Sequence, residues 1–349
     1  APDPRVSDGQ RPNLVARIPV KSSRTLWLFG HTDVVPPGDL EAWTSNPWQV
    51  RRDGDFLYGR GVEDNQQAIV CMMLLAEDVL AHNITPELSL GLVFMADEET
   101  GSLFGLEQLL NTAPHFFNPD DLYIVPDAGS SKGDVIEIAE KSQLWLKVQT
   151  TGIQCHASTP QKGRNAFLAA ADMALSCHNA LRAAFGDANP LFDRPHSTFV
   201  PGKHEANVPN INTVPGNDVF YIDCRLLPHV EMDNVLAKMR EVAAEVAARH
   251  CVQINISVAQ RQNATAIPQT CTVVTALKSA IASIYGEKAQ AVGIGGATVA
   301  SFLRHKGLPA AVWACLENTC HQPDERSSIT ATIKDAQVFA HILMNAAHV

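Results

Sequence analysis

Three short, almost wholly apolar runs most constrain the fold of this chain. They cover residues 26–29, 88–95 and 122–125. Strands buried on both faces of a parallel sheet are apolar throughout, whereas half-exposed strands alternate apolar and polar residues. Residues 67–81, between the first two runs, carry apolar side chains at helical spacing. The pattern therefore predicts an α/β domain whose mostly parallel sheet lies between two layers of helices.

The pattern changes after about residue 141. Three segments alternate between apolar and polar side chains, namely residues 144–150, 219–224 and 253–258. Two segments have the period of long amphipathic helices, namely residues 165–185 and 232–249. Alternation predicts strands with one covered face and one exposed face. This part of the chain therefore predicts a small α+β (ferredoxin-like) layer.

A length of 349 residues exceeds the usual size of one domain, so two domains are expected. We place the smaller domain at residues 143–266 and the larger, discontinuous domain at residues 1–142 and 267–349. A linker at residues 261–269 leads back to the larger domain. The elements that would complete it are helices from residue 271, at 297–304 and at 333–347, with a strand at 310–316.

Composition argues against two classes of partner. The net charge is −10, and the chain has no basic cluster beyond Arg51-Arg52. Nucleic acid and anionic membrane surfaces are therefore not expected as partners. The longest apolar stretch, residues 68–76, is too short to span a bilayer.

The eight cysteines form no CxxC pair, and most lie in apolar runs. Buried free thiols in a reducing, cytoplasmic compartment are therefore expected in place of a disulfide framework. Residue 1 is Ala and not Met, so we expect the natural N-terminus to lie upstream. A signal peptide that has been removed stays an open alternative.

Histidines and carboxylates gather in five short motifs, most of which directly follow an apolar run. They are His31-Thr-Asp33, Glu63-Asp64-Asn65, Asp97-Glu98-Glu99, Pro126-Asp127-Ala128 and Cys320-His321-Gln322. Taken singly, each is more commonly a turn, a helix cap or an exposed acidic loop. In parallel sheets, however, ligands collect at the carboxyl ends of strands. Two imidazoles, several carboxylates and one spare carboxylate are the inventory that two divalent cations and a proton transfer need.

Longer strings around these motifs carry a resemblance to a known family. The strings are Gly30-His-Thr-Asp-Val-Val-Pro36, Gly59-Arg-Gly-Val-Glu-Asp-Asn65, Asp97-Glu-Glu-Thr-Gly101 and Cys320-His-Gln-Pro-Asp-Glu325. They closely resemble the dinuclear zinc amidohydrolases and exopeptidases, which include aminoacylases, acetylornithine deacetylases, succinyl-diaminopimelate desuccinylases and glutamate carboxypeptidases. The resemblance covers essentially the whole chain. It implies two zinc ions per chain, and cobalt or manganese would suit the same donors.

The resemblance also implies a role for each motif residue. Asp64 would bridge the two ions, His31 and Asp127 would complete one site, Glu99 and His321 would complete the other, Glu98 would be the general base, and Asp33 would orient His31. A cis peptide bond is expected at Asp64–Asn65. These roles predict a metal-dependent hydrolase that cleaves an amide bond of an N-acyl amino acid or short peptide.

The smaller domain carries further candidates that the resemblance implies. His156, in a G-x-x-x-H pattern with Gly152, would reach across a homodimer and hydrogen-bond the developing oxyanion. The smaller domain would thus serve as a lid and dimerisation domain. Three further sets of substrate contacts are expected, namely Asn212 and Arg225 on a substrate carboxylate, and Gly295 with Gly296 in a glycine-rich loop. Relatives often follow these glycines with Thr and Asp, whereas this chain has Ala297-Thr298-Val299.

Two other readings stay open. Zinc aminopeptidases without a second domain use the same ligand order, but here 194 residues separate Asp127 from His321, which leaves room for the inserted domain. A non-catalytic binding scaffold would be expected to lose a ligand or the base, and none is lost here. Asp127 is a glutamate in the desuccinylases, which tilts the prediction slightly away from that substrate.

The start of the chain departs from the family pattern. Relatives carry a helix and a strand before the first metal motif, whereas only 30 residues precede His31. We therefore expect either a chain that is trimmed at its start or a sheet that lacks its edge strand.

Overall fold

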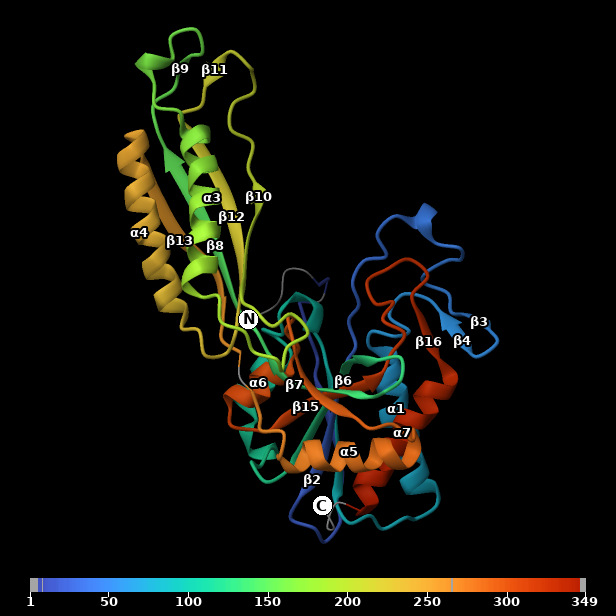
Figure 1. Ribbon diagram of the computed structural model, residues 1–349. Helices are drawn as coiled ribbons and strands as arrows, with labels where there is room; N and C mark the ends of the chain where they lie inside the picture. The colour runs from blue at the N-terminus through green and yellow to red at the C-terminus, as the bar shows by residue number, and fades with distance from the viewer. Residues whose placement is uncertain (1–5, 8, 265, 346–349) are drawn as a thin grey trace. The chain divides into compact units, whose positions relative to one another are not determined.

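The computed structural model describes residues 6–7, 9–264 and 266–345, and the chain divides into two compact units. The first unit comprises the chain up to Ile138, Ala266–Val292 and the residues from Thr298 on. The second comprises the chain from Ala139 through the lid region, together with Gly293–Ala297. The two units are described separately below (Figure 1). The lid and dimerisation role expected for the smaller part stays a prediction.

The first unit is built on a seven-stranded sheet. Its strands, in spatial order, are β1 (Leu14–Ile18), β5 (Ser89–Met95), β2 (Thr25–His31), β6 (Leu122–Ser130), β15 (Ala310–Cys315), β7 (Val135–Glu140) and β14 (Gln290–Ile294). Strand β2 runs parallel to β5 and β6, and β15 runs parallel to β6. Strands β1 and β7 pair antiparallel with their neighbours. The three apolar runs form the adjacent strands β5, β2 and β6, which confirms the expected mostly parallel sheet.

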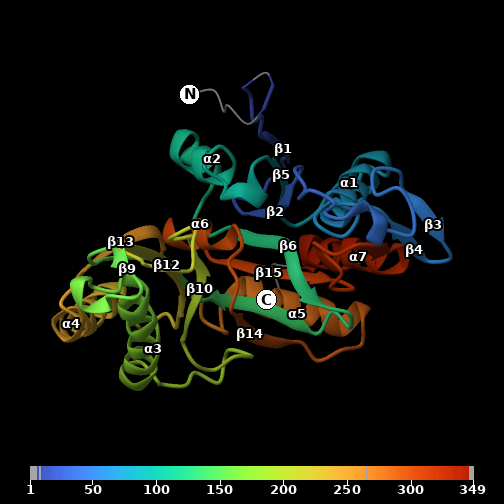
Figure 2. The ribbon, with the colours of Figure 1, turned by 90° about the horizontal axis from the view of Figure 1, so that it is seen from above.

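Helices cover both faces of this sheet. One face carries α1 (Gln66–Ala81), α5 (Thr272–Ile284) and α7 (Ile329–Asn345), and the other carries α2 (Leu106–Thr112) and α6 (Ala300–His305). Figure 2 shows α2 and α5 on opposite sides of the sheet. Because side chains alternate along a strand, Trp27 and Phe29 of β2 face α2 and α6. Leu26 and Leu28 point to the other face and are equally buried, so β2 is apolar at every position.

Shorter elements complete the first unit. A three-stranded antiparallel sheet consists of β3 (Arg51–Asp53), β4 (Phe56–Tyr58) and β16 (Arg326–Ser328). Short 3-10 turns lie at Leu40–Ala42, Glu98–Thr100 and Pro114–Phe116. Strand β1 supplies an edge to the central sheet ahead of His31, so the expectation that the sheet lacks this strand is wrong.

The second unit is a four-stranded antiparallel sheet with two helices on one face. Its strands, in spatial order, are β10 (Thr198–His204), β12 (Asn217–Leu226), β8 (Ser142–Thr151) and β13 (Gln253–Gln262). Helices α3 (Ala166–Ala184) and α4 (Met232–His250) pack on the sheet through its buried face. Strands β8 and β12 alternate buried with less buried residues, as their sequence predicts.

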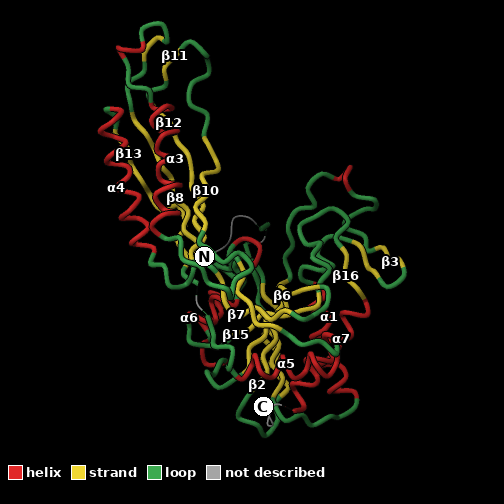
Figure 3. Tube along the Cα trace, in the orientation of Figure 1, coloured by secondary structure: helices red, strands yellow, loops and turns green. Residues whose placement is uncertain are grey.

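A two-stranded tip extends beyond the ends of β8 and β12 in this unit (Figure 3). It pairs β9 (Cys155–His156) with β11 (Thr213–Val214), and a 3-10 turn at Pro160–Lys162 follows β9. The tip carries two of the residues that the sequence selects for function, His156 and Asn212.

The remaining expectations concern membranes and thiols. Among the described residues, no helix has both the length and the apolar character needed to cross a bilayer. All eight cysteines are free thiols, and Cys71, Cys177, Cys224 and Cys315 are buried.

Candidate metal centre

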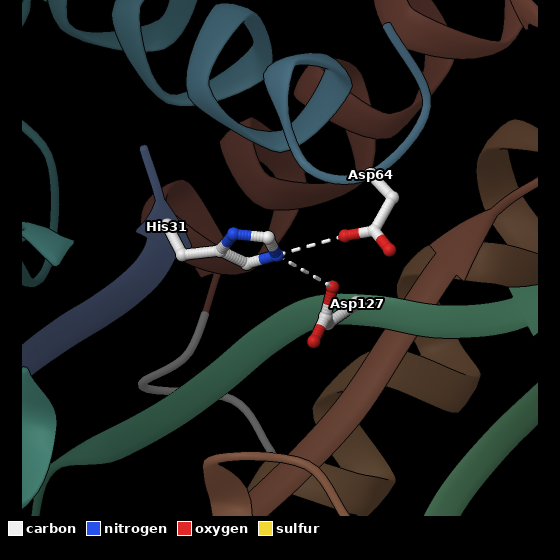
Figure 4. A group of neighbouring side chains, drawn as sticks. All are labelled: His31, Asp64 and Asp127. Atoms are coloured by element: carbon white, nitrogen blue, oxygen red, sulfur yellow. Dashed lines mark hydrogen bonds and ion pairs between the residues drawn. The ribbon is translucent and has the colours of Figure 1, made fainter. Parts of the chain in front are cut away.

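The first group of potential ligands lies at the carboxyl end of the central sheet. His31 is the last residue of β2, Asp127 lies in β6, and Asp64 precedes α1. The His31 Nε2 atom lies 2.8 Å from Asp64 Oδ1 and 3.6 Å from Asp127 Oδ1 (Figure 4). His31 is 1% exposed. Three elements that are distant in sequence therefore direct their side chains to one point.

The second group shares Asp64 with the first. His321 Nε2 lies 3.1 Å from Asp64 Oδ2 and 3.2 Å from Glu99 Oε2. Each group offers one ligand atom per residue, and within each group these atoms lie within 4.8 Å of one another. The two oxygens of Asp64 thus face different groups, which is the geometry that a bridging carboxylate requires.

Asn65 organises the first group, although the sequence did not single it out for this. The peptide bond between Asp64 and Asn65 is cis, as the family resemblance implies. The Asn65 side chain accepts a hydrogen bond from the His31 backbone N–H at 3.3 Å and donates to Asp127 Oδ1 at 2.8 Å. It also donates to the Pro126 carbonyl at 3.0 Å. One amide side chain therefore links all three ligand segments of the first group.

Asp33 contacts His31 differently from the way the sequence suggested. The His31 Nδ1 atom lies 2.9 Å from the Asp33 backbone oxygen and 3.7 Å from the nearer carboxylate oxygen. The carboxylate instead accepts from the backbone N–H groups of Glu98 and Glu99, at 3.1 and 3.2 Å. Strand β2 ends at His31, so the alternation of side chains along a strand no longer applies at Asp33. The Asp33 carboxylate therefore holds the turn that carries Glu98 and Glu99.

The carboxylates around His31 create a strongly negative pocket. Burial raises the pKa of Glu98 to about 8, and the charges of Asp127, Glu99 and Asp64 add to the rise. Burial opposes protonation of His31, but its neighbouring carboxylates, Asp127 foremost, outweigh burial and raise its pKa. The converging acids therefore stabilise a positive charge placed between them.

The residues present fit divalent cations. Glu99 Oε1 is buried and has no hydrogen-bond partner among the described residues. An unpaired buried acceptor is costly, and a cation beside it would remove that cost. Imidazole nitrogen and carboxylate oxygen are ligands that zinc and similar metals prefer in proteins. Glu98 belongs to neither group of ligands, so its carboxylate stays available for proton transfer.

The candidates in the second unit do not all come together. Asn212 lies beside His156, because Ala157 N–H donates to the Asn212 carbonyl at 2.9 Å. Arg225 lies near the opposite end of β12, eight residues along the strand from Asn217, or roughly 26 Å away at the rise of a strand. One chain therefore cannot bring Asn212 and Arg225 to the same carboxylate. The expectation that the two act together within one chain is wrong, because the 13-residue spacing is spent on extended strand.

The other two candidates of the second unit are Gly295 and Gly296. A Cβ atom at Gly295 would meet nothing within 4 Å, and one at Gly296 would meet only Ile294 Cδ1, at 3.9 Å. Neither residue has a positive φ. Packing and backbone conformation in the described chain therefore do not require glycine at these positions.

A sheet of this kind with acids and histidines converging at its carboxyl edge defines a class, the metal-dependent hydrolases. The chain belongs to Peptidase family M20/M25/M40, whose sequence pattern matches residues 27–345. This confirms the family expected from the motifs, and with it the enzyme class and a requirement for divalent metal ions.

The most similar relatives agree with that assignment. An uncharacterized metallohydrolase of Methanocaldococcus jannaschii is 38% identical over 345 residues, which cover 96% of this chain and 84% of that protein. A succinyl-diaminopimelate desuccinylase of Verminephrobacter eiseniae is 33% identical over 205 residues, 58% of this chain and 50% of that enzyme. The match to the metallohydrolase therefore extends over both units.

A solved structure shares the fold at lower identity. The M20 family metallo-carboxypeptidase Sso-CP2 of Sulfolobus solfataricus has a TM-score of 0.77 and 18% identity, over 97% of this chain and 88% of that chain. At this identity the match supports the fold alone.

Proposed function

We propose that this protein hydrolyses the amide bond of an N-acyl amino acid or short peptide with two zinc ions bound per chain, cobalt or manganese being alternatives. His31, Asp64 and Asp127 would hold one ion, and Asp64, Glu99 and His321 the other. The observation that carries the proposal is Asp64, whose two oxygens face the two histidines separately. When bound, such a pair of cations lowers the pKa of a water from about 15.7 towards about 7 and polarises a carbonyl oxygen.

Glu98 is the proposed general base. It would accept a proton from the attacking water and pass that proton to the departing amine nitrogen. Its position supports this role, since its backbone N–H is held by Asp33 while its side chain lies among the ligands without being one of them. The burial that raises its pKa also keeps bulk water from competing for the proton.

The test is Glu98→Gln. The variant should keep both cations, because no ligand is removed, and lose about 10²- to 10⁴-fold in turnover. Metal content and turnover are measured with zinc, cobalt and manganese on N-acetyl, N-succinyl and dipeptide substrates. Turnover above a tenth of wild type would exclude Glu98 as the base.

His156 is the proposed donor to the developing oxyanion, acting in the site of a partner subunit. The Ser158 N–H donates to His156 Nδ1 at 3.1 Å, so a neutral ring carries its proton on Nε2. His156 is exposed at the tip of its unit, and Asn212 lies next to it. If His156 enters a partner's site, Asn212 enters with it.

A homodimer is proposed on the surface of the second unit. Leu168 and Leu175 lie seven residues apart on α3, and thus on one face of that helix, at 57% and 67% exposure. Helix α3 packs beside β10, an edge strand of the sheet that exposes Val200. An apolar stripe next to an unpaired strand edge suits burial against a second copy.

Arg225 stays the proposed contact for a substrate carboxylate, in the open surroundings left by Gly295 and Gly296. Its guanidinium already pairs with Asp223, with Nε at 2.8 Å and Nη2 at 3.2 Å from the two carboxylate oxygens. A substrate carboxylate would therefore have to compete with that pair. The free thiols of the chain suit the proposed cytoplasmic location.

A second candidate function is the removal of an N-terminal residue from a short peptide. An aminopeptidase of Bacillus cereus shares this fold with a TM-score of 0.78, and the match covers 96% of this chain, including the inserted unit. The inserted unit therefore does not by itself argue against action on a free amine. Comparing each N-acetylated substrate with its free-amine counterpart separates the two candidates.

A further inference from the structure

Two buried carboxylates beside the ligand motifs have no part in the proposed reaction. Glu63 is 2% exposed and Glu325 is fully buried. Glu63 lies in the Asp64 loop (residues 59–65), and Glu325 lies in the His321 loop (residues 316–325). The two loops are separated by about 250 residues of chain, yet each sends its glutamate into the other.

Glu325 binds the backbone of the Asp64 loop. Its Oε1 accepts from the N–H groups of Glu63 and Asp64, both at 3.0 Å. Its Oε2 accepts from the Gly61 N–H at 3.0 Å and from the Arg60 guanidinium. The buried charge of Glu325 is thus balanced by Arg60, and its oxygens fix three successive turns of backbone around the bridging ligand.

Glu63 binds the backbone of the His321 loop in return. Its Oε1 accepts from the Asn318 N–H at 2.9 Å. Its Oε2 accepts from the Thr319 N–H at 2.6 Å and from the Thr319 hydroxyl at 2.8 Å. Glu63 therefore anchors the loop just before His321, and Glu325 anchors it four residues after His321.

The His321 loop needs such anchors because its backbone is unusual. Asn318, His321 and Asp324 have φ of 62°, 62° and 56°, in the left-handed region. Non-glycine residues rarely adopt this region, and they stay there only where surrounding contacts hold them. Three such residues in one short loop mean that the direction of the His321 ring depends on what the loop is tied to.

We propose that Glu63 and Glu325 are positioning residues, a reciprocal pair of carboxylates that ties the two loops together and fixes the separation of Asp64 from His321. The ligand atoms concerned, Asp64 Oδ2 and His321 Nε2, lie 3.1 Å apart. The first group of ligands does not depend on this tie, because Asn65 joins its segments. The proposal rests on the proposed function only in taking these atoms as cation ligands.

The experiment titrates the full-length protein with Co²⁺, by calorimetry and by visible absorption. In Glu63→Gln and Glu325→Gln, an amide NH₂ replaces an oxygen that accepts from N–H groups, so one anchor is lost. We expect the weaker of the two Co²⁺ affinities to fall about 10- to 100-fold, the effect typical of residues that orient metal ligands. The tighter affinity should stay within about threefold of wild type, and the absorption of the second Co²⁺ should change.

Glu317→Gln is the matched control. Glu317 lies in the same loop but pairs with Arg326, at 3.0 Å, and not with the Asp64 loop. It should bind both Co²⁺ ions as wild type does. Thr319→Val provides a milder variant if the glutamine variants do not fold, since it removes only the hydroxyl donor to Glu63. It should weaken the second ion alone, and Thr319→Ser should restore it.

Two results would overturn the proposal. Variants that bind both ions with wild-type affinity and spectrum would show that the carboxylates do not position the ligands. Variants that lose both ions equally would show a role in folding alone. A wild-type protein that binds fewer than two ions would instead contradict the proposed dinuclear site, so the two failures are distinguishable.

Discussion

The two ligand groups that share Asp64 differ in burial and in the backbone that carries them. In the first group, His31 ends a buried strand and is 1% exposed. In the second group, the His321 side chain is 53% exposed and lies in a loop with positive φ angles. Glu99, the third member of the second group, lies in a single 3-10 turn.

This difference teaches how one centre can combine a fixed half with an accessible half. Ligands on strand ends are held by the ladder of the sheet and lose little freedom when they bind a cation. Ligands on loops must be ordered by separate contacts, and they leave one side of the site open. We therefore expect the first group to bind its cation more tightly and the second group to face the substrate.

The largest expected effect comes from removing the residue that the two halves share. Asp64→Asn should lose both cations and lower turnover by at least about a thousandfold, since several kcal/mol of charge stabilisation depend on them. Metal content by mass spectrometry and turnover are the measurements. A variant that keeps two tightly bound ions would show that Asp64 is not common to the two sites.

Removing the two histidines tests the asymmetry directly. His31→Ala should weaken the tighter zinc ion by at least about a hundredfold, whereas His321→Ala should weaken the looser ion by a similar factor and spare the tighter one. Competition against a chelator gives both affinities for each variant. The comparison breaks down if His321→Ala removes the tighter ion.

A smaller effect is expected from Asp33→Asn. The variant keeps the backbone carbonyl that contacts His31 but weakens the acceptor for the N–H groups of Glu98 and Glu99. Turnover should fall about tenfold while the tighter ion binds as in wild type, since only the turn with the base is loosened. Loss of the tighter ion would mean that the carboxylate, and not the carbonyl, orients His31.

The smallest effect concerns the framework beneath the two halves. Asp335 accepts hydrogen bonds from Gln67 of α1, from the Cys315 N–H of β15 and from the Tyr285 hydroxyl. Burial nonetheless raises the pKa of Asp335 to about 7. The folded state therefore holds a proton between pH 4 and pH 7 that the unfolded chain has released, so this group's contribution to stability falls as pH rises through that window.

Urea unfolding of the zinc-loaded protein at pH 5 and pH 8 measures this contribution. Wild type should lose about 2 kcal/mol relative to Asp335→Asn between the two pH values, since one pKa unit corresponds to about 1.4 kcal/mol. Parallel pH profiles for the two proteins would show that Asp335 does not hold that proton.

The sequence predicted the parts of the site that follow strands, because strand ends impose a common edge. His31 and Asp127 follow apolar runs, and the rule that ligands gather at the carboxyl edge placed them together. The rule says nothing about contacts between loops. Glu63 and Glu325 lay inside the strings that carried the family resemblance, yet their partners are about 250 residues away and left no local signal.

Spacing also failed where the chain changes direction or stays extended. The alternation of side chains was carried one step beyond the end of β2, which gave the wrong atom of Asp33 as the partner of His31. The short spacing of Asn212 and Arg225 suggested one binding site, whereas β12 separates them by most of its length. The interrupted strand β10, with Pro201 and Gly202, and the short helix α2 had too few periodic residues to be predicted.

The chain positions of the ligands have a consequence for synthesis on the ribosome. His31, Asp64 and Asp127 all lie within the first 127 residues, whereas His321 follows nearly 200 residues later. The second half of the centre, and the strand β15 that lies beside β6, exist only after the inserted unit has been translated. At about 5–20 residues per second, the strand-borne ligands wait roughly 10–40 seconds for the loop-borne histidine. During that interval the nascent chain can capture one cation but not two.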